Sequence, residues 1–137
     1  MKNIPVGSRM PFLVKNCTLP SMIAYAGSTW DWHRVHYDME FLKAKGMDRP
    51  IVDGQIFGAY AVQAIQDWLG DKAFISLLDF RFTQLVYAGE TIRCEGEIIQ
   101  SDLVGVSISL KINVIDADAN ILRTAVEPMS ATVIWKD

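Results

Sequence analysis

Cysteine is scarce in this sequence. The 137 residues include only Cys17 and Cys94, which are too few and too far apart for a disulfide framework or a zinc ribbon. We expect both thiols to be reduced and buried, because an unpaired cysteine behaves as a small hydrophobic side chain. The sequence therefore indicates no stabilisation by disulfide bonds and no metal site built from cysteine.

Positive charge is also in short supply. Lysine and arginine total 13 against 16 acidic residues, and the formal net charge is −3. A protein that coats nucleic acid or an anionic membrane needs a dense positive field, so we expect neither partner. An anionic ligand would need a local basic patch. The candidate cations are Lys43, Lys45 and Arg49, with Arg81 and Arg93 further along the chain.

Long apolar runs are absent. None approaches the roughly 20 residues that span a bilayer, and residues 1–7 lack the apolar segment of a signal peptide. We therefore expect a cytoplasmic protein with no membrane partner. Half of the residues are nonetheless hydrophobic, and little of the sequence has low complexity. Residues 1–137 are thus predicted to form one compact domain with a real core.

The beginning of the chain predicts a short strand followed by a helix. Residues 11–17 have the composition of a strand, and Thr18 is a candidate helix N-cap with Pro20 in the first turn. We expect this helix to weaken at Gly27 and Ser28. The residues after Ser28 should therefore lie at or beyond the C-terminal end of this helix.

Two further helices are predicted before the middle of the chain. Asp38 is a candidate cap for a short helix over residues 39–45, which Gly46 would end. The clearest helix covers residues 55–69 and stops at Gly70. Its polar positions occupy only about one third of the circumference, so other structure must cover the rest.

Beyond the long helix, the hydrophobic period changes from helical to alternating. Residues 74–85 are largely apolar, whereas residues 91–98 and 104–114 alternate apolar with polar side chains. A last strand over 121–135 contains Pro128, which cannot donate to a ladder and predicts a bulge or an edge position. One buried helix and four long antiparallel strands at meander spacing predict an α+β fold, in which a curved sheet wraps around the central helix.

Acidic and imidazole side chains crowd together just after the first helix. Residues 30–38 read WDWHRVHYD, in which Asp31, His36 and Asp38 fit the pattern D-x(4)-H-x-D, and Asp53-Gly54 precedes the long helix. A carboxylate and a neutral imidazole that hold one water molecule can share the removal and the return of a proton. An amide at a helix N-terminus can stabilise developing negative charge.

These residues resemble the MaoC-like (R)-specific enoyl-CoA hydratases and dehydratases, whose motif commonly reads S-G-D-x-N-P-I-H-x-D. The resemblance runs from about Phe12 to Trp135 and implies a single hot-dog fold. It implies that Asp31 and His36 are the catalytic pair and that the Gly54 amide binds the thioester oxygen. It also implies a 2-enoyl-CoA substrate from fatty acid metabolism, no separate cofactor, and a homodimer or a heteromer with another hot-dog subunit.

The sequence departs from the family pattern at four positions. Trp30 stands where glycine is usual, His33 where asparagine is usual and Arg34 where proline is usual. Asp53 replaces the histidine of a His-Gly pair, whereas Gly54 is retained. Similar variants of the motif are typical of divergent branches of the family, including small subunits that act beside a second hot-dog chain.

Structural interpretations of the same residues stay open. Asp31 would then only cap a turn, and His36 would be a hydrogen-bonded structural imidazole. His33 and His36 with nearby acids suggest a metal site, but zinc needs three or four converging ligands, so we predict none. Trp30 and Trp32 are expected to wall a pocket or to pack into the core.

Two alternative functions also remain. A hot-dog acyl-CoA thioesterase would use Asp53 or Asp67 to activate water against the thioester carbon. A non-catalytic acyl-binding subunit of a heteromeric hydratase would leave the chemistry to its partner. Hydration is the leading hypothesis because only hydration explains the arrangement of Asp31 and His36.

Overall fold

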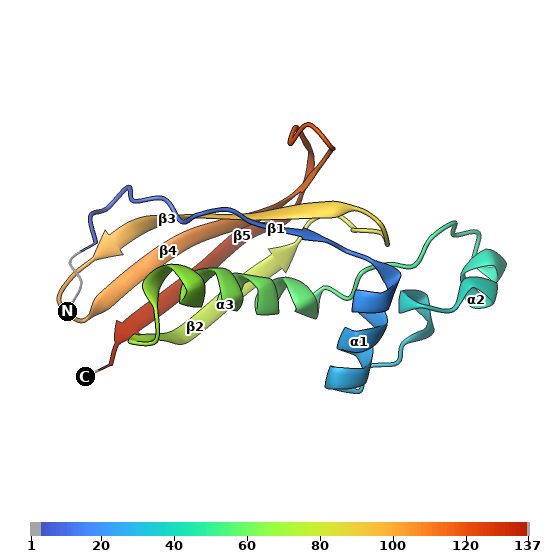
Figure 1. Cartoon of the computed structure of the whole chain (residues 1–137), viewed down its shortest axis with the longest axis horizontal. Coiled ribbons are helices and arrows are strands. Elements are labelled where there is room, and N and C mark those ends of the chain that lie inside the picture. Colours follow the sequence, from blue (N-terminus) through green and yellow to red (C-terminus); the bar gives the residue numbers. More distant parts are fainter. Residues whose placement is uncertain (1–3, 137) are drawn as a thin grey trace.

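The computed structural model describes residues 4–136 and contains one five-stranded antiparallel sheet. The elements in chain order are β1 (Leu13–Asn16), α1 (Leu19–Thr29), the 3₁₀ turn η1 (Arg34–His36), α2 (Met39–Ala44), α3 (Gln55–Leu69), β2 (Ala73–Phe82), β3 (Thr91–Ser101), β4 (Gly105–Ile115) and β5 (Ile121–Trp135). The sheet curves along α3, as Figure 1 shows. This arrangement confirms the predicted α+β fold with a central helix. Over the residues described, no helix is long and apolar enough to cross a membrane.

The core lies between α3 and the concave face of the sheet. The helix buries Phe57, Ala61 and Ile65, while Gln63 and Asp67 on its other side are exposed. The strands supply alternating buried side chains, which include Ile92, Cys94, Ile98, Ile108 and Ile112. The apolar face of α3 and the apolar face of the sheet therefore pack together in one core, as the helical and alternating periodicities of the sequence predict.

The order of the strands differs from a simple meander. β3, β4 and β5 are consecutive neighbours, but β2 pairs with β5 at the far edge, and the complete order is β1-β3-β4-β5-β2. The connection over residues 83–90 must cross three strand spacings, about 14 Å. Eight residues span up to about 26 Å, so this connection reaches without strain. Turn spacing in the sequence fixes the strand boundaries but not the neighbours of β2.

Pro128 lies at a bulge inside the sheet, so the bulge prediction is confirmed and the edge prediction is wrong. β5 is flanked by β4 and β2. Val126 and Met129 are both paired on each side, and a single residue of each neighbouring strand lies opposite Glu127 and Pro128 together. The bulge interrupts the ladder where the proline has no amide hydrogen to donate, which lets a central strand accommodate it.

Both cysteines are free and buried, as predicted. Burial, with a smaller effect of the Glu90 charge, raises the pKa of Cys17 to about 11. Burial and the Glu95 charge raise the pKa of Cys94 to about 12. We expect neither thiol of the folded protein to react with a disulfide reagent at about pH 8, and both to react after denaturation. A thiol that reacts rapidly without denaturant would contradict the described burial.

Candidate functional site

A lobe built from α1, η1, α2 and the connection to α3 extends beyond one end of the sheet (Figure 1). The predicted site residues come from three points of this lobe. Asp31 follows α1, His36 ends η1, and Asp53 with Gly54 precedes α3. The lobe thus brings these three segments to the N-terminal end of the central helix.

The end of α1 holds Asp31 in place. The helix is longer than predicted and continues through Gly27 and Ser28 to Thr29, because the Ser28 and Thr29 hydroxyls donate to carbonyls one turn earlier. Trp30 then takes a left-handed conformation, with φ of 58°, and the Asp31 amide donates to Ala26 O at 3.1 Å. The Asp31 carboxylate accepts the His33 amide at 3.3 Å and remains exposed.

The orientation of His36 is fixed through one ring nitrogen. Its Nδ1 lies 2.6 Å from the carbonyl oxygen of Ile51, which can only accept a hydrogen bond. Nδ1 therefore carries the hydrogen, and Nε2 of the neutral ring is left as an acceptor. The Ile51 amide in turn donates to Val35 O at 3.0 Å. Two hydrogen bonds thus join the turn that carries His36 to the segment before α3.

That segment is itself anchored to the core. The Val52 amide donates to Val86 O at 2.8 Å, and the Ala88 amide donates to Pro50 O at 2.9 Å. The side chains of Val52 and Val86 are both buried. The lobe therefore does not depend on surface contacts alone to position His36.

Asp53 converges with the predicted pair. One ligand atom from each of Asp31, His36 and Asp53 lies within 4.8 Å of the other two. The Asp53 carboxylate is half-buried, and its Oδ1 accepts the Gln55 amide at 2.9 Å at the start of α3. In the part of the chain that the structure describes, this is the one group of side chains close enough together to hold a metal ion.

The other histidine of the motif does not join this group. His33 Nδ1 accepts the Val35 amide at 3.3 Å, so its ring caps η1. Asp38 caps α2, as predicted, by accepting the Phe41 amide at 3.0 Å. This bond and the Arg34 guanidinium hold the pKa of Asp38 below its ordinary value. The His33 and His36 rings make an edge-to-face contact with a centroid distance of 6.0 Å, but His33 is not a member of the group whose ligand atoms converge.

Gly54 has an ordinary backbone conformation, and a side chain at this position would require the Phe82 ring to move. It has a helical conformation at the start of α3, with φ of −62°. A Cβ atom at this position would lie 2.5 Å from Cζ of the Phe82 ring. Among residues 4–136, no group accepts a hydrogen bond from the Gly54 amide. The amide is thus available to a ligand at the helix N-terminus.

Tyr25 on α1 also borders this site, and no sequence motif marks it. Burial, followed by the charges of Asp53 and Asp31, raises the pKa of its phenol. Both carboxylates therefore lie within electrostatic range of this side chain on α1. Tyr25 lies six residues before Asp31 in the sequence. A tyrosine in an amphipathic helix does not by itself indicate a functional site.

The two tryptophans lie on the outside of the lobe. Trp30 is 80% exposed and Trp32 is 39% exposed, so the prediction that they pack into the core is wrong. Trp32 makes edge-to-face contacts with Trp30 and Tyr37, each with a centroid distance of 5.9 Å. The left-handed turn at Trp30 directs this side chain away from the core.

The basic residues do not form a single patch. Lys45 lies over the Phe41 ring, and Arg49 lies over Tyr87 and 3.9 Å from Glu90. Arg93 is paired with Glu95 at 2.8 Å, with both side chains largely buried. A phosphate ligand would have to displace Glu95 to reach Arg93, which leaves the cations around α2 as the more available ones.

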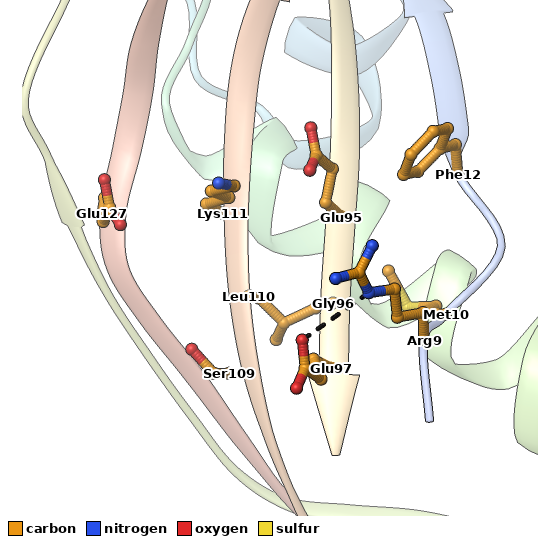
Figure 2. Close-up of a pocket in the computed structure, with 10 residues that line it drawn as sticks. All are labelled: Arg9, Met10, Phe12, Glu95, Gly96, Glu97, Ser109, Leu110, Lys111 and Glu127. Atoms are coloured by element: carbon orange, nitrogen blue, oxygen red, sulfur yellow. Dashed lines mark ion pairs between the residues drawn. The ribbon is translucent and has the colours of Figure 1, made fainter. Parts of the chain in front are cut away.

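A surface groove of about 370 Å³ lies away from the Asp31 group. Figure 2 shows it over β3, β4 and β5, with α3 behind the strands. Arg9 is paired with Glu97 at 3.8 Å, and Glu95, Lys111 and Glu127 complete an alternating pattern of charge. This mixed charge favours no single class of ionic ligand, and none of the candidate residues lines the groove.

A family model and a curated relative both match this chain. The family described as MaoC like domain matches residues 11–119. The peroxisomal enoyl-CoA hydratase 2 of Arabidopsis thaliana is 30% identical over 95 residues, which are 67% of this chain and 31% of that protein. This chain therefore spans about a third of the length of the curated relative that it matches.

Solved structures show the same fold. The (R)-hydratase from A. caviae involved in PHA biosynthesis has a TM-score of 0.81 at 20% identity, over 99% of this chain and all of that chain. A chain of the ChsH1-ChsH2 complex from Mycobacterium tuberculosis has a TM-score of 0.82 at 20% identity, over 97% and 98% of the two chains. The hot-dog fold expected from the sequence is confirmed.

Proposed function

The chain belongs to the family of MaoC-like dehydratase domains, and from this premise we propose that it adds water reversibly across the double bond of a 2-enoyl-CoA thioester. The observation that carries the proposal is the convergence of Asp31 and His36 within 4.8 Å, at the helix end where the Gly54 amide is available. The curated relative, named an enoyl-CoA hydratase, supports the same substrate class.

The proposed reaction is based on the hydrogen-bonding capacity of the pair. Since His36 Nδ1 donates to Ile51 O, both Nε2 and the Asp31 carboxylate are acceptors for the two hydrogens of one water molecule. The water oxygen forms a bond with the β-carbon of the substrate while one of its O–H bonds breaks. The pair takes this proton and returns it to the α-carbon, where the π electrons form the new C–H bond.

Gly54 has a separate part in this proposal. During the addition, negative charge develops on the thioester oxygen. The Gly54 amide would donate a hydrogen bond to that oxygen, and the dipole of α3 would favour the charge. A side chain at this position would require the Phe82 ring to move, so glycine leaves the surroundings of the amide undisturbed.

We propose that a second hot-dog subunit closes the substrate channel. Asp31 is exposed, and the edge strand β2 carries three large apolar side chains that are at least 49% exposed, namely Phe74, Leu77 and Phe82. An unpaired apolar edge of this kind is typical of an interface between chains. The similar ChsH1-ChsH2 chain is part of a complex of two different proteins, so the second subunit is either a copy of this chain or another hot-dog chain.

The edge can be tested with Leu77→Lys. We expect the wild-type chain to be dimeric in light scattering at micromolar concentration and the variant to be monomeric, because a buried unpaired lysine opposes association. Leu103→Lys, on the exposed turn between β3 and β4, is the matched control and should leave the dimer intact. A monomeric wild-type chain would contradict self-association and assign the edge to a different subunit.

The thioesterase alternative now depends on Asp53 alone. Asp67 lies near the other end of α3, about 20 Å from Gly54 at 1.5 Å per residue. Asp53 is the acid that lies at the site. Hydration remains the better-supported function because it employs Asp31 and His36 together, whereas thioester hydrolysis by Asp53 does not require either of them.

One assay separates the two reactions. The purified chain is incubated with crotonyl-CoA, and loss of the conjugated thioester absorbance is followed beside release of free thiol. We expect the absorbance to fall without thiol release. Since Cys17 and Cys94 are buried, protein thiols should not obscure the second signal. Thiol release without hydration would identify the chain as a thioesterase. If neither reaction occurs with or without a co-encoded partner, the remaining hypothesis is a non-catalytic acyl-binding subunit.

A further inference from the structure

Asp53 occupies a position that the predicted mechanism does not use. Its carboxylate reaches the Asp31 and His36 side chains although it comes from a different segment of the chain. It is half-buried, and the Gln55 amide engages only one of its oxygens, at 2.9 Å. A carboxylate that served only to accept the Gln55 amide would not need to converge with an imidazole.

Over residues 4–136 Asp53 belongs to none of the ion pairs, and the imidazole that converges with it is that of His36. From α1, the neighbouring titratable group is Tyr25, whose phenol is kept neutral by burial and by the charges of Asp53 and Asp31. From the loop after α1, the neighbour is the Asp31 carboxylate. Positive charge that develops on the imidazole would therefore be matched by two carboxylates on separate segments.

We propose that Asp53 is a further positioning residue of the hydration reaction, where it stabilises the positive charge that His36 acquires on taking a proton from water. This inference rests on the proposed function. When the water O–H bond breaks, the proton adds to Nε2 and the ring becomes an imidazolium, held by Ile51 O through Nδ1. The negative charge of the Asp53 carboxylate lowers the energy of the imidazolium, while the proton stays on His36.

The matching family position carries histidine, so this role is specific to chains with an acid there. A neutral histidine could donate a hydrogen bond but could not supply a negative charge. We therefore expect this chain to depend on a second carboxylate where the family pattern provides none. The dependence should appear in kcat rather than in KM, because the imidazolium forms only along the reaction.

Asp53→Asn is the informative substitution. Asparagine keeps a side-chain oxygen that can accept the Gln55 amide, so this hydrogen bond at the start of α3 is preserved while the charge is removed. We expect kcat to fall by about tenfold or more with KM nearly unchanged and the same thermal midpoint. Asp67→Asn removes an exposed charge near the C-terminal end of α3 and should leave kcat unchanged.

The Asp53→Ala variant can be tested for rescue of kcat by an added carboxylate, a response that a purely structural role of Asp53 would not produce. It removes both the hydrogen bond to the Gln55 amide and the charge, and it leaves space beside His36. We expect added formate to restore part of the lost kcat in Asp53→Ala, whereas formate should not increase the activity of Asp31→Asn. If Asp53→Asn also lowers the thermal midpoint, the formate response measured below that midpoint decides the role.

The outcomes separate this inference from the proposed function. A wild-type chain that hydrates crotonyl-CoA together with an Asp53→Asn variant of equal kcat overturns the role of Asp53 and leaves the hydratase intact. Absence of formate rescue together with loss of stability also overturns it. A wild-type chain without hydration rejects the proposed function itself. Thiol release that is lost in Asp53→Asn would assign Asp53 to thioester hydrolysis instead.

Discussion

Replacement of Asp31 by asparagine or of His36 by alanine is expected to reduce kcat for crotonyl-CoA hydration by about 10²- to 10⁴-fold. Asparagine lacks the negative charge that holds the water and stabilises the imidazolium, and alanine removes the ring nitrogen that takes the proton when Nδ1 donates to Ile51 O. Initial rates from the loss of thioester absorbance measure the effect. An unchanged kcat in both variants would contradict the assignment of Asp31 and His36 as the catalytic pair.

Stability must be measured beside activity for these two variants. Asp31 is exposed, so its substitution should shift the free energy of unfolding little. His36→Ala leaves Ile51 O without its donor at a half-buried position, which should cost about 1 kcal/mol. The activity loss should therefore greatly exceed the stability loss, and the two should be separable at a temperature well below unfolding.

Two residues of the same motif serve as controls. His33 caps η1 and Asp38 caps α2, and neither belongs to the group formed by Asp31, His36 and Asp53. We expect His33→Ala and Asp38→Asn to lower stability modestly and to change kcat by less than about tenfold. If they reduce kcat as strongly as the substitutions at Asp31 and His36, the motif acts as a structural unit and the assignment of roles within it is wrong.

The sequence predicts the local elements of this site well. Thr18 caps α1, Asp38 caps α2, and Gly70 ends α3, each as its residue type favours. The two caps depend on side chains that bond to amides three residues away, and Gly70 adopts a positive φ of 86° that glycine tolerates, so all three features are encoded locally. The extension of α1 past Gly27 was missed because the hydroxyls of Ser28 and Thr29 bond back into the helix instead of interrupting it.

The convergence of Asp53 could not be predicted in the same way. It depends on residues 37–50 folding back so that Ile51 bonds both to Val35 and to the His36 ring. It also depends on Val52 pairing with Val86, more than thirty residues later. Such pairings have no signature in local periodicity, and the same limit explains why β2 was not predicted beside β5.

The largest loss of stability is expected for Gly105→Ala in β4. A Cβ atom at Gly105 would lie 1.9 Å from the carbonyl oxygen of Val133 on the paired strand β5. The Gly105 amide donates to Asp102 Oδ1 at 2.9 Å, and its carbonyl oxygen accepts the Asp102 amide at 3.0 Å. Because backbone faces backbone at this point, neither strand can yield without losing ladder hydrogen bonds, and we expect a cost of about 3 kcal/mol or more.

Gly96→Ala in β3 provides the matched comparison. Its Cβ atom would lie 3.0 Å from Cδ2 of Leu110, which is the end of a flexible side chain, so we expect a cost nearer to about 1 kcal/mol. Chemical denaturation of both variants measures the difference, and equal stabilities would show that β4 and β5 can separate locally at Gly105. Since neither glycine touches the Asp31 group, the folded fraction of each variant should keep the wild-type kcat. This result would show that the sheet supports the lobe without taking part in the chemistry.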